Sequence, residues 1–164
     1  RCYIKMNIKI ITVGKIKEKY LRMAIDEYSK RLGAYCRLSI IEVKDEKIEE
    51  RFSDAEKARA VALEGERIAR HLKDNEIIAV LKITGKQLTS PDFAKKIEDY
   101  GIQGKSSLTF IIGGSLGLSP EIEARAHWDL SFSKMTFPHQ LFRVMLLEQI
   151  YRAFKIMKNE TYHK

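Results

Sequence analysis

The stretch FIIGGSLGLSP, residues 110–120, joins the most strand-like segment of the chain to a turn of small residues. The apolar run LTFII, residues 108–112, is nearly continuous, which is typical of a central strand buried on both faces of a parallel sheet. Gly113-Gly114 follows it, and Ser119-Pro120 then matches a helix cap with a proline in the first turn. The stretch therefore predicts a strand, a tight turn and a helix.

Strand-like and helical patterns alternate along the rest of the chain. A capping box from Ser53 to Glu56 opens a helix within the charged stretch 44–72, whose charges we expect to face solvent. Further strands are expected at 7–13, 37–43, 76–81 and 129–133. Further helices are expected before Gly33, from a cap at Ser90 with Pro91 in the first turn, and over 140–157. This order predicts an α/β fold with a mostly parallel sheet flanked by helices.

Length and charge limit the possible classes of protein. A chain of 164 residues, of which 45% are apolar, is long enough for one hydrophobic core and short for two. Its formal net charge of +8 favours a polyanionic partner, although a protein can also be basic without one. Residues 1–5 precede a plausible initiator at Met6, so we expect a non-native extension followed by a single domain over 6–164.

Cysteine content and hydropathy argue against several further classes. Cys36 stands alone within the domain, so the sequence predicts neither a disulfide framework nor a metal site. A reducing, cytoplasmic compartment is expected. No apolar run approaches the roughly 18 residues that a membrane span requires, and we expect no membrane partner.

The glycine pair lies where an α/β sheet binds its ligands. Ligands bind outside the carboxyl ends of the strands, which selects the loops after Leu81, Ile112 and Ser133. Glycine lets the backbone approach a ligand closely, while a tight turn without any ligand explains the same residues. The loop has neither the Gly-Lys-Ser/Thr of a phosphate-binding loop nor the G-x-G-x-x-G of a dinucleotide site, so phosphate binding is disfavoured.

Charged residues punctuate the apolar helix that follows residue 138. Arg143 comes four residues after His139, so both project from one face. Glu148 and Arg152 have the spacing of a helical ion pair, which is sufficient to explain them. An arginine on a mostly apolar helix needs an anionic partner, which makes Arg143 a candidate functional residue.

Six segments of the chain carry a resemblance to a known family. They are FIIGGSLGLS (110–119), LSFSKMTFPHQLFRVMLLEQIYRAFKI (130–156), YHK (162–164), IKIITVGKIKEKY (8–20), YSKRL (28–32) and ITGKQLTS (83–90). Together they resemble the RlmH family of SPOUT methyltransferases, which methylate N3 of a pseudouridine in large-subunit (23S) ribosomal RNA. The resemblance covers residues 6–164, and its specificity comes from the order and spacing of all the segments rather than from any one of them. The chain departs from the family pattern just before Tyr162, where NET replaces a more usual small residue or proline.

The resemblance implies a SPOUT fold with a C-terminal trefoil knot and a bound S-adenosyl-L-methionine. The family binds this cofactor among the loops that carry Leu81, Gly113 and residues 132–137. Backbone amides and an apolar slot suit an adenine ring, and a cofactor without phosphate needs no phosphate-binding lysine. The implied cofactor-binding residues are Leu81, Gly113, Gly114, Leu118, Phe132, Ser133, Lys134, Met135, Thr136 and Phe137.

The methyl group of this cofactor is already activated, so the protein must mainly align it and remove a proton. His163 and His139 are the candidate bases near neutral pH. The family match to YHK favours His163, with Tyr162 stacking on or orienting the substrate base and Arg143 and Arg152 holding phosphate or ring oxygens. His139 is otherwise expected to contact the substrate.

The resemblance also implies a homodimer that acts on 23S ribosomal RNA, with the tail of one subunit near the cofactor of the other. The apolar excess of helix 140–157 agrees, because a single core face cannot bury all of Leu141, Met145 and Ile150 together with Phe142, Leu146 and Phe154. Lys15 and Lys17 are candidate phosphate contacts, or part of a solvated face. A SPOUT-fold RNA-binding protein without catalysis and a methyltransferase acting on transfer RNA remain as alternatives.

Overall fold

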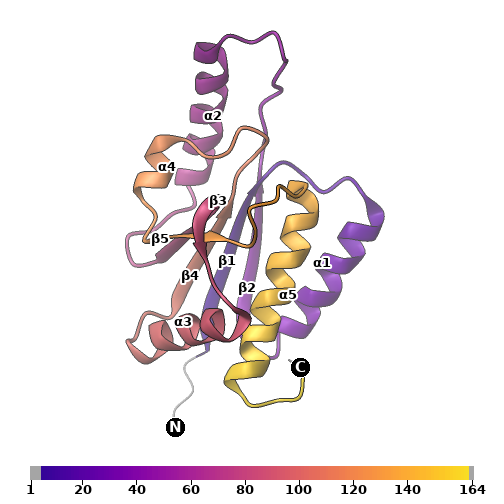
Figure 1. Cartoon of the computed structure of the whole chain (residues 1–164), viewed down its shortest axis with the longest axis vertical. Coiled ribbons are helices and arrows are strands. Elements are labelled where there is room, and N and C mark those ends of the chain that lie inside the picture. The colour runs from indigo at the N-terminus through magenta and orange to yellow at the C-terminus, as the bar shows by residue number, and fades with distance from the viewer. Residues whose placement is uncertain (1–4, 163–164) are drawn as a thin grey trace.

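A five-stranded sheet forms the centre of the computed structural model, which describes residues 5–162 (Figure 1). Every pair of neighbouring strands is parallel. The strands lie in the order β2 (Cys36–Val43), β1 (Met6–Val13), β4 (Ser107–Ile112), β3 (Ile77–Gln87) and β5 (Trp128–Ser131). The predicted α/β fold is confirmed, and β4 is the central strand that its apolar run indicated. Phe110 and Ile111 of β4 are both 0% exposed.

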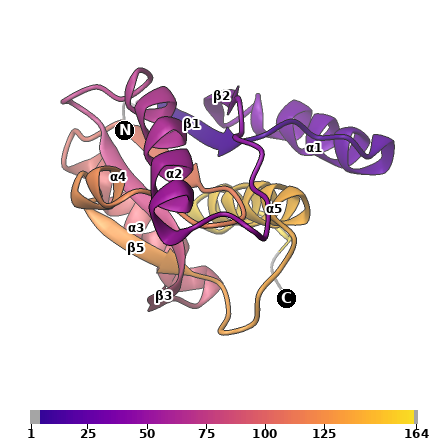
Figure 2. The ribbon, with the colours of Figure 1, turned by 90° about the horizontal axis from the view of Figure 1, so that it is seen from above.

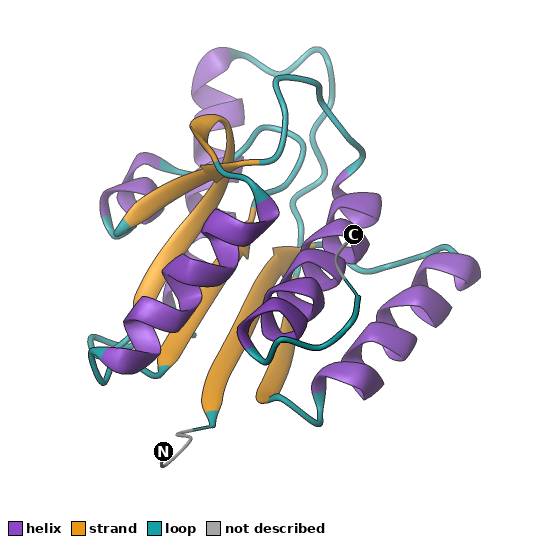
Figure 3. Cartoon of the chain, turned by 60° about the horizontal axis from the view of Figure 1, so that its bottom comes forward, coloured by secondary structure: helices purple, strands orange, loops and turns teal. Residues whose placement is uncertain are grey.

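Helices cover both faces of the sheet. The larger core cluster lies under α1 (Lys19–Leu32), α3 (Ser90–Ile102) and α5 (His139–Met157). In Figure 3, α3 and α5 pass in front of the strands and α1 lies beside them. A smaller cluster, centred on Ile11, Val80 and Ile111, packs against α2 (Asp54–Ala69) and α4 (Pro120–Ala124) on the other face. Because strand side chains alternate between faces, β1, β3 and β4 contribute to both clusters.

Strand β3 continues past the predicted end at residue 81, and its register with β5 is broken. Leu130 of β5 is opposite Leu81 and again opposite Lys86, so residues 82–85 stand out of the ladder. A Cβ on Gly85 would lie 2.9 Å from the carbonyl carbons of Asp129 and Leu130. Glycine is needed there because the backbones of the two strands approach so closely. The bulge turns residues 82–84 toward the carboxyl end of the sheet, where they become available to a site.

The predicted helix caps are largely confirmed. Ser53 and Glu56 form the reciprocal capping box of α2, and the Ser119 hydroxyl accepts a hydrogen bond from the N–H of Ile122 at the start of α4. The cap of α3 is Thr89 rather than Ser90, because the Thr89 side chain accepts from the N–H of Asp92. Strand β5 ends at Ser131, two residues earlier than predicted.

Helix α5 lies between α1 and α3 (Figure 1), and this position explains its apolar excess. Ile150 is 0% exposed within the single chain, whereas Met145 is only partly buried, so the apolar residues of this helix are not all buried against one face, as expected. Leu141 is 39% exposed and remains available for another surface. The trefoil knot stays a prediction. None of the helices in residues 5–162 is long and apolar enough to cross a membrane.

Candidate functional site

A cavity of about 340 Å³ opens at the carboxyl ends of β3, β4 and β5. It is bordered by the β3 bulge, by the loop after β4, by the loop after β5 and by the first turn of α5. Figure 2 views the molecule from this side, with α2 in the foreground. The lining includes nine of the predicted cofactor-binding residues: Leu81, Gly113, Gly114, Leu118, Phe132, Ser133, Met135, Thr136 and Phe137.

The loop after β4, residues 113–119, is called the glycine loop below. The N–H of Gly117 donates to the carbonyl oxygen of Gly114 at 3.0 Å, which closes a tight turn. Gly117 has φ +82°, a conformation that other residues rarely adopt. A Cβ on Gly113 would lie 2.9 Å from the carbonyl carbon and oxygen of Gly117. The turn is therefore held by backbone packing that a side chain on Gly113 would disrupt.

The loop after β5 forms the opposite wall. The N–H of Met135 donates to the Ser133 hydroxyl at 3.0 Å, and the Ser131 hydroxyl donates to the carbonyl oxygen of Ser133 at 3.1 Å. The Phe132 ring packs on Phe142 of α5, with 4.9 Å between centroids. Lys134 is exposed and does not line the cavity, so the structure places this predicted cofactor-binding residue outside the site.

Two charged residues that were not predicted stand at the cavity edge. Lys82 of the β3 bulge and Glu123 of α4 both line the cavity, with 3.4 Å between Lys82 Nζ and Glu123 Oε2. Lys82 Nζ also lies 3.8 Å from Asp129 Oδ2. This ion pair supplies one polar corner in a cavity with mainly apolar and backbone walls. Glu123 was missed because an acidic residue on a short polar helix resembles an ordinary solvated face.

His139 lies in the first turn of α5 and lines the same cavity. Burial, together with the positive charge of Arg143, lowers the pKa of His139 below its usual value. The imidazole is therefore neutral near pH 7 and can accept a proton or a hydrogen bond there. The structure thus brings this predicted substrate-binding residue to the same cavity as the predicted cofactor-binding residues.

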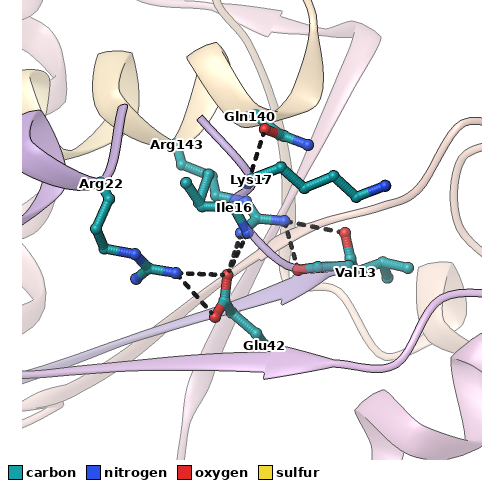
Figure 4. A network of polar contacts seen from close by, with 8 residues as sticks. Val13, Ile16, Lys17, Arg22, Glu42, Gln140 and Arg143 are labelled. Carbon is teal, nitrogen blue, oxygen red and sulfur yellow. Dashed lines mark hydrogen bonds and ion pairs between the residues drawn. The ribbon is translucent and has the colours of Figure 1, made fainter. Parts of the chain in front are cut away.

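Arg143 lies outside the cavity, in a polar network that joins α5 to β1 and β2 (Figure 4). Its Nη1 donates to Glu42 Oε2 at 2.7 Å, and its Nη2 donates to the carbonyl oxygens of Val13 and Gly14 at 3.0 and 2.8 Å. The guanidinium is 3% exposed. The expected anionic partner is Glu42, and a side chain so buried has no access to an RNA phosphate in this structure. Arg143 therefore has a structural role in this network, and its catalytic role stays a prediction.

Glu42 also accepts a hydrogen bond from the N–H of Ile16 at 2.9 Å and pairs with Arg22 at 3.3 Å. It thereby holds the loop between β1 and α1, which carries the exposed side chains of Lys15 and Lys17. The N–H of Lys17 donates to Gln140 Oε1 at 3.5 Å, next to the first turn of α5. Both lysines therefore lie at the same edge of the sheet as the cavity, with their side chains exposed.

The C-terminal tail lies against α5, away from the cavity of the same chain. Tyr162 donates to Glu148 at 3.2 Å, and its ring packs edge-on against Tyr151 and under Arg152. Burial and the negative charge of Glu148 raise the pKa of Tyr162 to about 12. Glu148 and Arg152 form the predicted ion pair at 2.8 Å. The predicted base His163 lies outside the described residues.

The cavity fits the nucleoside cofactor implied by the sequence. Its volume lies in the range of small-molecule sites, and its walls combine Phe, Leu and Met side chains with the backbone of the glycine loop. Gly113 and Gly114 line the cavity without side chains, and the space that a Cβ would need on each is already filled, by Gly117 beside Gly113 and by Glu64 and Val13 beside Gly114. Within residues 5–162, no group of three His, Cys, Asp or Glu side chains is placed to hold a metal ion.

Comparison with known proteins gives concordant matches. A family model described as "Predicted SPOUT methyltransferase" matches residues 6–163. Proteins from Bifidobacterium adolescentis and Clostridium tetani, both named "Ribosomal RNA large subunit methyltransferase H", are 62% and 57% identical over 159 residues, which is 97% of this chain and 100% of each relative. A solved structure, a probable methylase family protein from Haemophilus influenzae, aligns with TM-score 0.54 at 12% identity, covering 96% of this chain and 70% of that chain.

Proposed function

The chain belongs to the SPOUT methyltransferase family, and from this premise we propose that it methylates large-subunit ribosomal RNA with S-adenosyl-L-methionine as methyl donor. The observation that carries the proposal is the identity of 57–62% to rRNA methyltransferases over their whole length. The cavity at the glycine loop supplies the site that such an enzyme needs. The finer assignment, to N3 of a pseudouridine in 23S RNA on the assembled ribosome, follows the sequence resemblance. Such a substrate places the enzyme in the cytoplasm.

The residues around the cavity would hold the cofactor through shape and backbone contacts. The glycine loop offers amide groups without side chains, and Leu118, Phe132 and Phe137 supply apolar walls. When bound, the cofactor supplies a methyl group activated by a positively charged sulfur. The protein contributes mainly position, since holding two reactants in line removes most of the entropic cost of their encounter.

The reaction also requires that the ring nitrogen lose its proton. His139 borders the cavity, and its lowered pKa keeps it able to accept a proton at neutral pH. His163 remains the base favoured by the sequence resemblance, with Tyr162 orienting the substrate base. Arg152 is the proposed partner for a phosphate or carbonyl oxygen, and Lys15 and Lys17 are proposed contacts to the RNA backbone.

A second copy of the chain is proposed to bring the tail to the cavity. Tyr162 packs at Tyr151, whereas Phe142 of the same helix borders the cavity. Nine helical residues separate these two positions, which is about 13 Å along the helix axis. The described tail therefore ends away from its own cavity, which supports a homodimer in which each tail serves the partner. Light scattering of the purified protein would test this, and a monomer at all concentrations would contradict it.

The function is tested by mass spectrometry of RNA from a strain that lacks the gene. We expect one methyl group to disappear from a pseudouridine of the large-subunit RNA and to return when the gene is restored. Loss of a methyl group from transfer RNA instead would assign the alternative substrate. Unchanged RNA, together with no calorimetric binding of S-adenosyl-L-methionine, would indicate an RNA-binding protein without catalysis.

A further inference from the structure

Helix α2 supports the glycine loop from the side opposite the cavity. Two neighbouring residues of the helix make the contact: Glu64 lies beside Gly114, and Gly65 packs against Ser119. Glu64 is 4% exposed and Ser119 is 2% exposed, so both contacts are buried. Neither Glu64 nor Gly65 is among the residues that line the cavity. The two ends of the glycine loop therefore rest on one turn of one helix.

Glu64 joins two loops at the carboxyl edge of the sheet. Its Oε2 accepts a hydrogen bond from the N–H of Glu46, in the loop after β2, at 2.9 Å. Its Oε1 lies 3.2 Å from the position that a Cβ on Gly114 would occupy. A carboxylate is costly to bury, and burial, with repulsion from Asp45 and Glu46, raises the pKa of Glu64. The expectation that the charges of this stretch all face solvent is wrong at this residue.

Arg67, on the same helix, binds Glu46, the residue whose N–H donates to Glu64. Its Nη1 pairs with Glu46 Oε2 at 2.8 Å and donates to the carbonyl oxygen of Lys44 at 2.9 Å. The arginine therefore fixes the loop whose N–H binds Glu64. The loop after β2, helix α2 and the glycine loop are thus connected through one buried carboxylate.

Gly65 permits the close approach of α2 to the end of the glycine loop. A Cβ at this position would overlap the Ser119 hydroxyl oxygen and lie 3.1 Å from Ser119 Cβ. Ser119 has little freedom to move, because its hydroxyl caps α4 and its side chain is buried. Any side chain at residue 65 must therefore displace either α2 or the glycine loop.

We propose that Glu64 and Gly65 are positioning residues that hold the glycine loop in its binding shape before the cofactor arrives. A loop ordered in advance binds more tightly, because less conformational entropy is lost on binding. The cofactor part of this inference rests on the proposed function, whereas the ordering of the loop does not. Helix α2 thereby acts on cofactor affinity without touching the cavity.

The first test compares Glu64→Ala with Glu66→Ala, which removes an exposed carboxylate from the same helix. The reporter is amide hydrogen exchange at Gly117 in the cofactor-free protein, because this N–H closes the turn onto Gly114. We expect E64A to speed exchange at Gly117 and to weaken calorimetric cofactor affinity, each by about tenfold, which corresponds to about 1.4 kcal/mol. Glu64→Gln keeps an acceptor for the Glu46 N–H and should stay within about twofold of the wild type. E66A should change neither quantity.

The second test adds a methyl group at Gly65 and leaves the buried Glu64 carboxylate in place. Gly65→Ala should speed exchange at Gly117 and weaken cofactor binding by moving the loop. Adding Ser119→Gly removes the overlapping side chain, and glycine is a tolerated helix cap, so the double variant should recover both quantities. Faster exchange at the Phe110 amide, in the central strand β4, would show that E64A unfolds the whole domain. In that case G65A and the double variant G65A/S119G test the proposal in its place.

Exchange at Gly117 that stays at the wild-type rate in both E64A and G65A would overturn the proposal. Recovery that fails in the double variant would also contradict it, because the effect of G65A would then not pass through Ser119. Exchange is measured without cofactor or RNA, so it is independent of the function. A wild-type protein that binds no S-adenosyl-L-methionine would refute the proposed function and leave the exchange test valid.

Discussion

Arg143 of α5 and Glu42 of β2 form an ion pair at 2.7 Å between residues 101 positions apart in the chain. The pair crosses the end of β1, where Arg143 also binds two carbonyl oxygens. It fixes the first turn of α5, which carries His139 and Phe142 to the cavity wall. The position of His139 and Phe142 in the cavity wall therefore depends on the ion pair between Arg143 and Glu42, which itself lies outside the cavity.

Arg143→Ala should lower the free energy of unfolding by roughly 3 kcal/mol, because it leaves Glu42 and two carbonyl groups without their main donor. Chemical denaturation measures this change. The control is Glu27→Ala, which breaks an exposed ion pair of α1 and should cost at most about 0.5 kcal/mol. A loss below 1 kcal/mol for R143A would show that the buried network contributes little.

Glu42 should make stability depend on acid pH. Burial acts to raise the pKa of Glu42, but the hydrogen bond from the Ile16 N–H and the charges of Arg22 and Arg143 outweigh it, so the pKa is lowered. A carboxyl group with a lowered pKa stabilises the fold above its unfolded pKa, near 4.3, and this contribution is lost as the pH falls through the folded pKa. Unfolding of the wild type and Glu42→Gln should therefore differ most above pH 5 and converge in stronger acid. A difference that is constant with pH would contradict this assignment.

Gly113→Ala should weaken cofactor binding at least about tenfold, or about 1.4 kcal/mol, as measured by calorimetry. The new Cβ would meet the Gly117 carbonyl group at 2.9 Å, and backbone atoms cannot move aside without reshaping the turn. Gly101→Ala in α3 is the matched control, since its Cβ would lie at an ordinary 3.6 Å from Met6 Sδ. Equal affinity of both variants would exclude the glycine loop from the cofactor site.

His163→Ala should lower the methylation rate by about 10²–10⁴, the usual contribution of a general base, with little change in cofactor affinity. Single-turnover methylation of ribosomes from the deletion strain measures the rate. His71→Ala, at an exposed position, is the control and should leave the rate unchanged. A fully active H163A enzyme would transfer the proposed role to His139, whose alanine variant should then lose activity.

Replacing Lys15 and Lys17 by alanine should weaken RNA binding and reduce its dependence on salt. Each lost phosphate contact is expected to lower the slope of log affinity against log salt by about 0.7–0.9. Lys105, which is exposed at the amino end of β4, supplies the control variant. An unchanged slope in the double variant would assign the two lysines to an ordinary solvated face.

The sequence predicted those parts of the fold that local patterns determine. The run 108–112 identified the central strand because burial on both faces makes it almost wholly apolar, with Thr109 as its one polar side chain. The box at Ser53 and Glu56 identified the start of α2 because capping is a contact between near neighbours. The continuation of β3 beyond Leu81 was missed, since a polar segment that leaves the ladder and rejoins it resembles a loop.

The candidate site was predicted where the ends of parallel strands meet, and the glycine turn marked it. Contacts between distant segments were not predictable in the same way. No spacing rule joins Arg143 to Glu42, so the arginine resembled a substrate ligand until its partner was located. Glu64 was hidden among many charged residues of a helix that is mostly exposed, and only its burial distinguishes it from them.

Leu130 of β5 is opposite both Leu81 and Lys86 of β3, so residues 82–84, which form the β3 wall of the cavity, are not needed to pair the two strands. The residues that flank the segment 82–85 are both opposite Leu130 of β5, so the strands can keep their alignment when the side chains at 82–84 change and Gly85 is retained. Substitutions at Lys82, Ile83 and Thr84 can thus alter what the enzyme accepts while leaving its architecture intact. Ligand preference could therefore change through these three positions, in evolution or by design, without a change of fold.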